Sequence, residues 1–193
     1  RKSGMPLFSM ESQKPLHEFD FIAFSIPFEN DYSHVLKILE LGRIPLEANQ
    51  RGEGAPLCLA GGISVTLNPE PLADFLDCVV LGDGEEAVLE LCAAVRASRA
   101  AGEDRAALLA RLAAIEGVYV PAFFDVDYGS DGTISALRPL RPGYGKVRRR
   151  FLADLGIFWF EEPFQPEDLE SYAALRATVG QKSGAPRTVR IAA

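Results

Sequence analysis

Cysteine, histidine and basic residues are scarce in this sequence, and each shortage excludes a class of protein. The 193 residues include three cysteines, an odd number without any C-x-x-C pair, which argues against a disulfide framework. The 20 lysines and arginines are outnumbered by 27 aspartates and glutamates, which gives a net charge of −7. Such an acidic chain lacks the positive field that holds a nucleic acid backbone, so we expect no DNA or RNA partner.

Long apolar runs are missing as well. No run approaches the roughly 20 residues of a membrane span, and the polar N-terminus is unlike a signal peptide. We therefore expect no membrane partner and a cytoplasmic protein, in which Cys58, Cys78 and Cys92 are small buried residues in apolar surroundings. The sequence starts at Arg1 rather than at methionine, which we interpret as a fragment or a trimmed chain.

What the sequence does contain is an alternation of short apolar runs and helical patterns, which is typical of an α/β protein. Buried strands are predicted at 20–26, 56–60 and 78–81, and helices at 31–41, 69–75, 85–101 and 104–115. The pattern from 119 to 137, with a tight turn at 129–132, predicts strands and a small β-hairpin. The fold class is therefore α/β, an open parallel sheet with helices on both faces plus a small β-hairpin.

A linker rich in proline and glycine follows at 139–143. Beyond it we expect a short helix to 155, a strand at 157–160, a helix at 167–179 and a final strand at 188–192. The one basic cluster falls in this region, and we interpret it as a solvated helix start, with a phosphate or membrane patch as the alternative. The cluster consists of Arg138, Arg141, Lys146, Arg148, Arg149 and Arg150.

Five stretches, each at an expected strand end or helix start, resemble the N-terminal domain of a family of radical SAM proteins. They are 6–12 (PLFSMES), 24–29 (FSIPFE), 60–62 (AGG), 68–75 (NPEPLADF) and 82–86 (GDGEE). The resemblance covers residues 5 to about 140. It implies a cobalamin-binding-like domain with a flavodoxin-like or Rossmann-like fold, and cobalamin as the candidate cofactor.

In such a sheet, ligands bind outside the carboxyl ends of the strands, where glycine lets a ligand approach the backbone closely. By analogy with cobalamin-binding domains, the candidate contacts lie in the loops that follow three of the strands. They are Ser25, Gly61, Gly62, Thr66, Gly82 and Gly84.

The chain also departs from the families it resembles. Residues 1–140 lack the first strand and helix of a cobalamin-binding fold and its Asp-x-His-x-x-Gly motif, and we interpret the two histidines, His17 and His34, as surface residues. Radical SAM chemistry requires a C-x3-C-x2-C loop, which the three cysteines do not form. We therefore expect no iron–sulfur cluster in this chain, and we expect a radical SAM domain of the parent protein to be its partner.

A second resemblance begins near residue 152. The stretches 155–163 (LGIFWFEEP) and 166–170 (PEDLE) are similar to a barrel strand and the following helix of the enolase superfamily. That similarity implies a Mg²⁺ ligand at Glu161. A single carboxylate does not make a magnesium site, so we favour a solvated strand end at Glu161 and Glu162 and expect no enolase-type catalysis.

Two unrelated halves suggest a chimera, engineered or natural, or a join made in sequence assembly. We expect residues 141–193 to supply a linker and a β-α-β unit that completes the sheet of residues 1–140, because both are right-handed parallel crossover units.

The leading function is a non-catalytic scaffold or cofactor-domain remnant. The alternatives are a working cobalamin-binding module, a Mg²⁺-dependent enzyme fragment, and an interaction module that uses the hairpin or a sheet edge. The sequence leaves the oligomeric state open.

Overall fold

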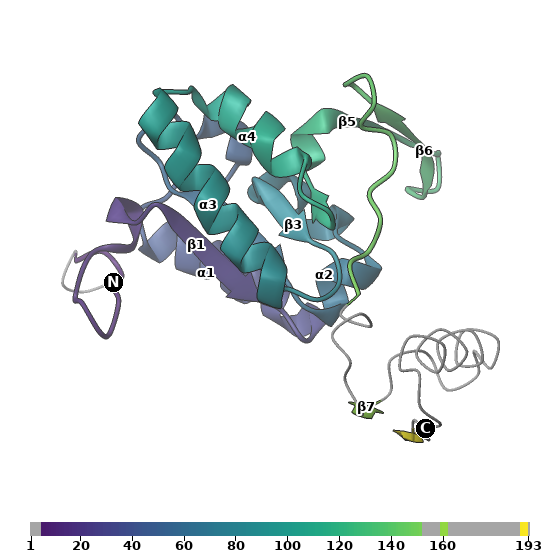
Figure 1. The fold of residues 1–193 in the computed structure, drawn as a ribbon, viewed down its shortest axis with the longest axis horizontal. Coiled ribbons are helices and arrows are strands. Elements are labelled where there is room, and N and C mark those ends of the chain that lie inside the picture. Colours follow the sequence, from purple (N-terminus) through teal and green to yellow (C-terminus); the bar gives the residue numbers. More distant parts are fainter. Residues whose placement is uncertain (1–4, 152–158, 162–189, 193) are drawn as a thin grey trace, which may run out of the picture. The chain divides into compact units, whose positions relative to one another are not determined.

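The computed structural model describes residues 5–151, 159–161 and 190–192. The chain forms two compact units, residues 1–150 and 151–193. The first unit is built on a four-stranded sheet in the order β1-β2-β3-β4 (Figure 1). Its strands are β1 (Phe21–Ser25), β2 (Leu57–Gly61), β3 (Cys78–Val80) and β4 (Val118–Tyr119). The predicted α/β class is confirmed.

Helices cover both faces of this sheet. The long helices α3 (Glu85–Ala101) and α4 (Arg105–Ala113) lie on one face, and α1 (Tyr32–Leu41) lies on the other (Figure 1). The connection between β2 and β3 contains α2 (Ile63–Leu67) and the 3-10 helix η4 (Glu70–Phe75). Further 3-10 turns are η1 (Leu16–Glu18), η2 (Glu29–Asp31), η3 (Ala48–Gln50) and η5 (Pro121–Phe123).

The first three strands are parallel, as expected, but β4 is antiparallel to β3. A single helix returns the chain to the amino end of a sheet, and the next strand is then parallel to the last. Here two helices, α3 and α4, follow β3, and the second reverses the direction of the first. The chain arrives back at the end where β3 finished, and the Leu81 N–H donates to the Gly117 carbonyl at 2.7 Å.

The core follows from the apolar patterns of the strands and helices. Strands β2 and β3 are buried on both faces, and α3 turns Ala87, Leu91 and Val95, spaced four residues apart, toward the sheet. Gly102 ends α3 with a φ of 65°, a conformation that glycine adopts at low cost. The largest fully buried side chains are Ile26, Leu39, Leu72, Leu76, Leu112, Val65, Val79, Val118 and Val120.

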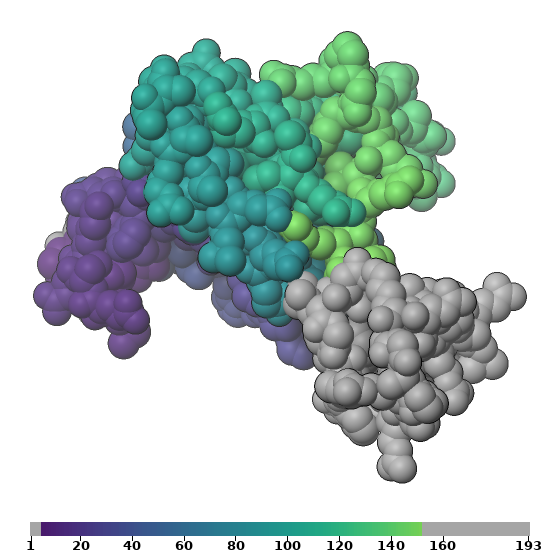
Figure 2. Space-filling model, in the orientation of Figure 1, coloured from purple at the N-terminus to yellow at the C-terminus, as the bar shows by residue number. Residues whose placement is uncertain are grey.

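The predicted hairpin is confirmed as β5 (Phe124–Tyr128) paired with β6 (Ile134–Pro139). The expected strand at 119–124 is interrupted, because Pro121 has no N–H to donate to a ladder and instead starts η5. After the hairpin the chain folds back, and Tyr144 donates its hydroxyl to Val118 O at 2.7 Å while accepting from Val120 N at 2.9 Å. The hairpin and the segment that follows it, to residue 151, form the green part of the surface in Figure 2.

In the second unit, β7 (Trp159–Glu161) pairs in parallel with β8 (Arg190–Ala192). The helix expected at 167–179 lies outside the described residues. We predicted that this unit completes the sheet of the first unit and that the chain is a chimera. Both statements stay predictions. No helix in the described part of the chain is long and apolar enough to cross a membrane.

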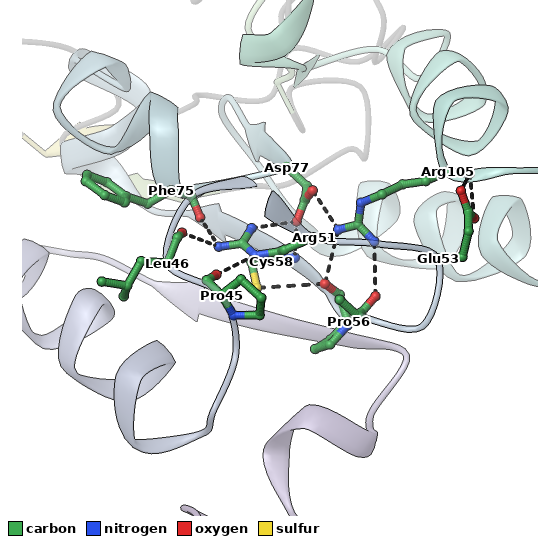
Figure 3. Close-up of polar contacts among 10 residues, drawn as sticks. Pro45, Leu46, Arg51, Glu53, Pro56, Cys58, Phe75, Asp77 and Arg105 are labelled. Carbon is green, nitrogen blue, oxygen red and sulfur yellow. Dashed lines mark hydrogen bonds and ion pairs between the residues drawn. The ribbon is translucent and has the colours of Figure 1, made fainter. Parts of the chain in front are cut away.

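A buried carboxylate joins the segments at the amino ends of β2 and β3 (Figure 3). Asp77 Oδ2 accepts from Arg51 Nη1 at 2.8 Å and from the Cys58 N–H at 2.7 Å, and its Oδ1 accepts from Arg105 Nη2 at 2.7 Å. The side chains of Asp77 and Arg51 are 2% and 0% exposed. Further donors of both arginines are directed at carbonyl groups, those of Pro45, Leu46 and Phe75 for Arg51 and of Ala55 and Pro56 for Arg105. The buried Nε of Arg105 has no hydrogen-bond partner among the described residues.

We expect Asp77→Asn to lower the free energy of unfolding by about 3–5 kcal/mol, because it leaves two largely buried guanidinium groups without their counter-charge. Urea unfolding followed by far-ultraviolet circular dichroism measures the loss. The matched control is Asp74→Asn, an exposed aspartate three residues away, which we expect to change the free energy by about 0.5 kcal/mol or less. Equal losses in the two variants would contradict a structural role for the Asp77 charge.

Candidate functional site

The carboxyl ends of β1 and β2 lie side by side, because the two strands pair in parallel. Ser25 and Gly61, the last residues of the two strands, are register partners. Ser25 is exposed and Gly61 is half-buried. A Cβ atom added at Gly61 would meet Val80 at 3.8 Å, an ordinary contact, so close packing within the protein does not require glycine there.

Gly62 has a structural explanation. Its φ is 112°, and an added Cβ atom would lie 2.6 Å from the carbonyl oxygen of Ile26. The segment after β1 crosses here, with Ile26 N–H donating to Gly61 O at 2.8 Å and Ser64 N–H donating to Ile26 O at 3.3 Å. The glycine therefore lets two backbone segments meet, and the space beside it is occupied by the protein itself.

Gly82 is enclosed in the same way. Its φ is 95°, and an added Cβ atom would collide with the carbonyl oxygen of Arg150. Arg150 N–H donates to Leu81 O at 2.9 Å, and Asp83 N–H donates to Arg150 O at 3.2 Å. The segment at Arg150 thus runs along the end of β3 and closes the loop that was predicted to receive a ligand.

The two other candidate contacts, Thr66 and Gly84, also have roles in the fold itself. Thr66, in α2, accepts a hydrogen bond through Oγ1 from the Gly82 N–H at 3.2 Å and so ties α2 to the loop after β3. Gly84 is the N-cap residue of α3, and no atom lies within 4 Å of a Cβ added there. Of the six candidates, Gly62 and Gly82 have backbone packed against them, whereas Ser25, Gly61 and Gly84 offer the open part of the edge.

The basic cluster does not begin a helix. Residues 145–151 contain no helix, and two of the arginines are ion-paired within the domain. Arg150 Nη2 lies 2.5 Å from Glu90 and 3.6 Å from Glu86, both on α3. Arg138 on β6 pairs with Asp125 and Asp127 on the facing strand β5. The interpretation of a solvated helix start is therefore wrong for these residues.

The three thiols occupy three different elements. Cys58 on β2 and Cys78 on β3 are fully buried, and Cys92 on α3 is half-buried. Burial raises the pKa of Cys58 to about 12, and burial together with the nearby Asp77 carboxylate also raises the pKa of Cys78. Iron–sulfur clusters are held by thiolates, a form that both positions disfavour.

The metal candidate is only partly described. Glu161 ends β7 and is the register partner of Ala192, and its side chain lies outside the described part. Among the described residues, no group of three histidine, cysteine, aspartate or glutamate side chains is placed to hold a metal ion.

Comparison with known proteins identifies the family of the chain. Searches of curated proteins and of solved structures found no match. The model of the family described as radical SAM proteins, N-terminal, matches residues 1–121. Since this match spans more than half of the 193 residues, the chain belongs to the family of radical SAM proteins, N-terminal.

Proposed function

We propose that this chain is a non-catalytic domain of a radical SAM protein, which accompanies the radical-generating domain and does not itself hold the iron–sulfur cluster. The state of the thiols is the observation that carries this proposal. A cluster needs thiolates gathered around one point, whereas Cys58 and Cys78 are enclosed in the sheet core and Cys92 lies on a helix. Burial also holds the first two in the protonated form.

The sheet gives such a domain a rigid support. Its two central strands are buried on both faces, and the Asp77 network ties the segments before β2 and β3 together. A partner domain that contacts the carboxyl edge would meet Ser25 and the half-buried Gly61. We propose a radical SAM domain of the same parent protein as that partner.

The carboxyl edge also supports a second candidate function, cobalamin binding. The observation that favours it is the exposure of Ser25 in register with Gly61, at the end of parallel strands where ligands bind. Gly62 and Gly82 contribute nothing to it, because backbone segments fill the space beside them. A cobalamin tail would therefore have to lie over β1 and β2.

Anaerobic incubation of the protein with ferrous iron and sulfide tests the first proposal. We expect no bound iron or acid-labile sulfide after desalting, because the two buried thiols resist deprotonation. The matched control is Cys92→Ser, which removes the one half-buried thiol and should give the same values as the parent chain. A cluster that forms in the parent and is lost in the Cys92→Ser variant would contradict a non-catalytic domain.

A titration with hydroxocobalamin, followed in the visible spectrum, tests the second candidate. We expect saturable binding that Ser25→Phe abolishes and Ala23→Phe leaves intact. Both residues are exposed on β1, and since they lie two positions apart their side chains share one face, about 7 Å apart along the strand. A folded sample that leaves the spectrum unchanged, or equal binding by the two variants, would rule out this use of the edge.

A further inference from the structure

A cavity of about 670 Å³ opens at the amino-end side of the sheet, away from the edge discussed above. Its walls come from η3, η4, α4 and the start of the hairpin, with the Asp77 network among its lining residues. The volume falls within the roughly 300–1,000 Å³ of typical small-molecule sites. The cavity belongs entirely to the first unit.

One wall of the cavity is aromatic and apolar. The rings of Tyr119 and Phe124 lie 5.2 Å apart and are 5% and 9% exposed, and Tyr128 adds a third, more exposed ring. Leu109 and Val126 extend this wall. Aromatic faces attract both apolar groups and cations.

The charges around the cavity are predominantly negative. Five carboxylates line it, against two guanidinium groups. Both guanidinium groups are bound within the protein, because Arg51 and Arg105 each donate to Asp77 and to backbone carbonyls, and only Nε of Arg105 lacks a partner among the described residues. The excess negative charge therefore belongs to the remaining four carboxylates, those of Glu53, Glu70, Asp74 and Asp125.

Two of these carboxylates, both on η4, are available to a cation. Glu70 accepts a hydrogen bond from the Tyr119 hydroxyl at 2.7 Å, which orients it at the aromatic wall. Burial and this carboxylate raise the pKa of Tyr119, so the phenol keeps its proton and donates. Asp74 is exposed and forms no ion pair or hydrogen bond within the described part of the chain. Asp125 and Glu53 are engaged by Arg138 and by the Arg105 N–H.

The arrangement suits an organic cation better than a metal ion. A metal needs several ligand atoms gathered around one point, and no group of three such side chains occurs among the described residues. A protonated amine needs one or two carboxylates for its charge and an apolar wall for its carbon skeleton. Both are present here.

We propose that this cavity binds a small organic cation, with its ammonium group beside Asp74 and Glu70 and its apolar body against Tyr119 and Phe124. This assignment is independent of the function proposed for the carboxyl edge. The cavity would be a second ligand site, at the amino ends of the strands.

Three probes with the same phenyl ring separate charge from shape: phenethylammonium, 2-phenylethanol and 3-phenylpropionate. Each is titrated into the ¹⁵N-labelled chain, and the amide shifts of cavity residues are followed. We expect phenethylammonium to bind with a dissociation constant of about 1 mM, a value typical of a probe of this size. The neutral alcohol should bind at least about tenfold more weakly, since it lacks the charge-assisted contact, and the anion should not bind. Equal binding of amine and alcohol, or no shift at cavity residues with the amine, would overturn the proposal.

Single substitutions test whether the carboxylate of Asp74 binds the ammonium group. We expect Asp74→Asn to weaken phenethylammonium binding about tenfold and leave the fold unchanged, because this side chain is exposed. The control is Glu11→Gln, which removes an exposed carboxylate that does not line the cavity and should leave the affinity unchanged. An Asp74→Asn chain that binds the amine as tightly as the parent would also overturn the proposal.

Discussion

The charge of Asp77 is the constraint on which the rest of the domain depends. A buried carboxylate is costly unless it is paired and hydrogen-bonded, and Asp77 meets this requirement with two arginines and the Cys58 N–H. These partners come from before β2, from β2 itself and from the start of α4. One side chain therefore fixes where three distant segments meet, those of residues 51–58, of Asp77 itself and of Arg105. The same contacts hold Arg51 and Arg105 in place at the cavity.

The two ends of the sheet have different chemistry for a physical reason. At the carboxyl ends, the chain uses positive-φ glycines to bring backbone segments together, Ile26 at Gly62 and Arg150 at Gly82. Such contacts satisfy backbone polar groups but fill the space that a ligand would need. At the amino ends the segments are held by long side chains instead. Those side chains span gaps that backbone cannot fill, and a cavity persists beside them.

Much of the fold could be predicted from local pattern. The apolar runs at 20–26, 56–60 and 78–81 became β1, β2 and β3 nearly residue for residue, and the helices at 85–101 and 104–115 became α3 and α4. The five residues of α2 are too few to show a period, so they were missed. The direction of β4 depends on how two helices pack against each other, which no local pattern records. The short strands β7 and β8 fall within or beside the runs predicted for them.

The sites were harder to predict than the fold, because a site depends on partners distant in sequence. A glycine after a strand has the same local signature whether a ligand or the protein's own backbone lies beside it, and only the position of Arg150 distinguishes the two at Gly82. The cavity residues come from η3, η4, α4 and β5, and none forms a motif in sequence. The separation of the two ends also has a consequence for function. A partner domain on the exposed carboxyl edge and a cation at the amino end would occupy different surfaces, so both could be bound at once, joined by the buried strands β2 and β3.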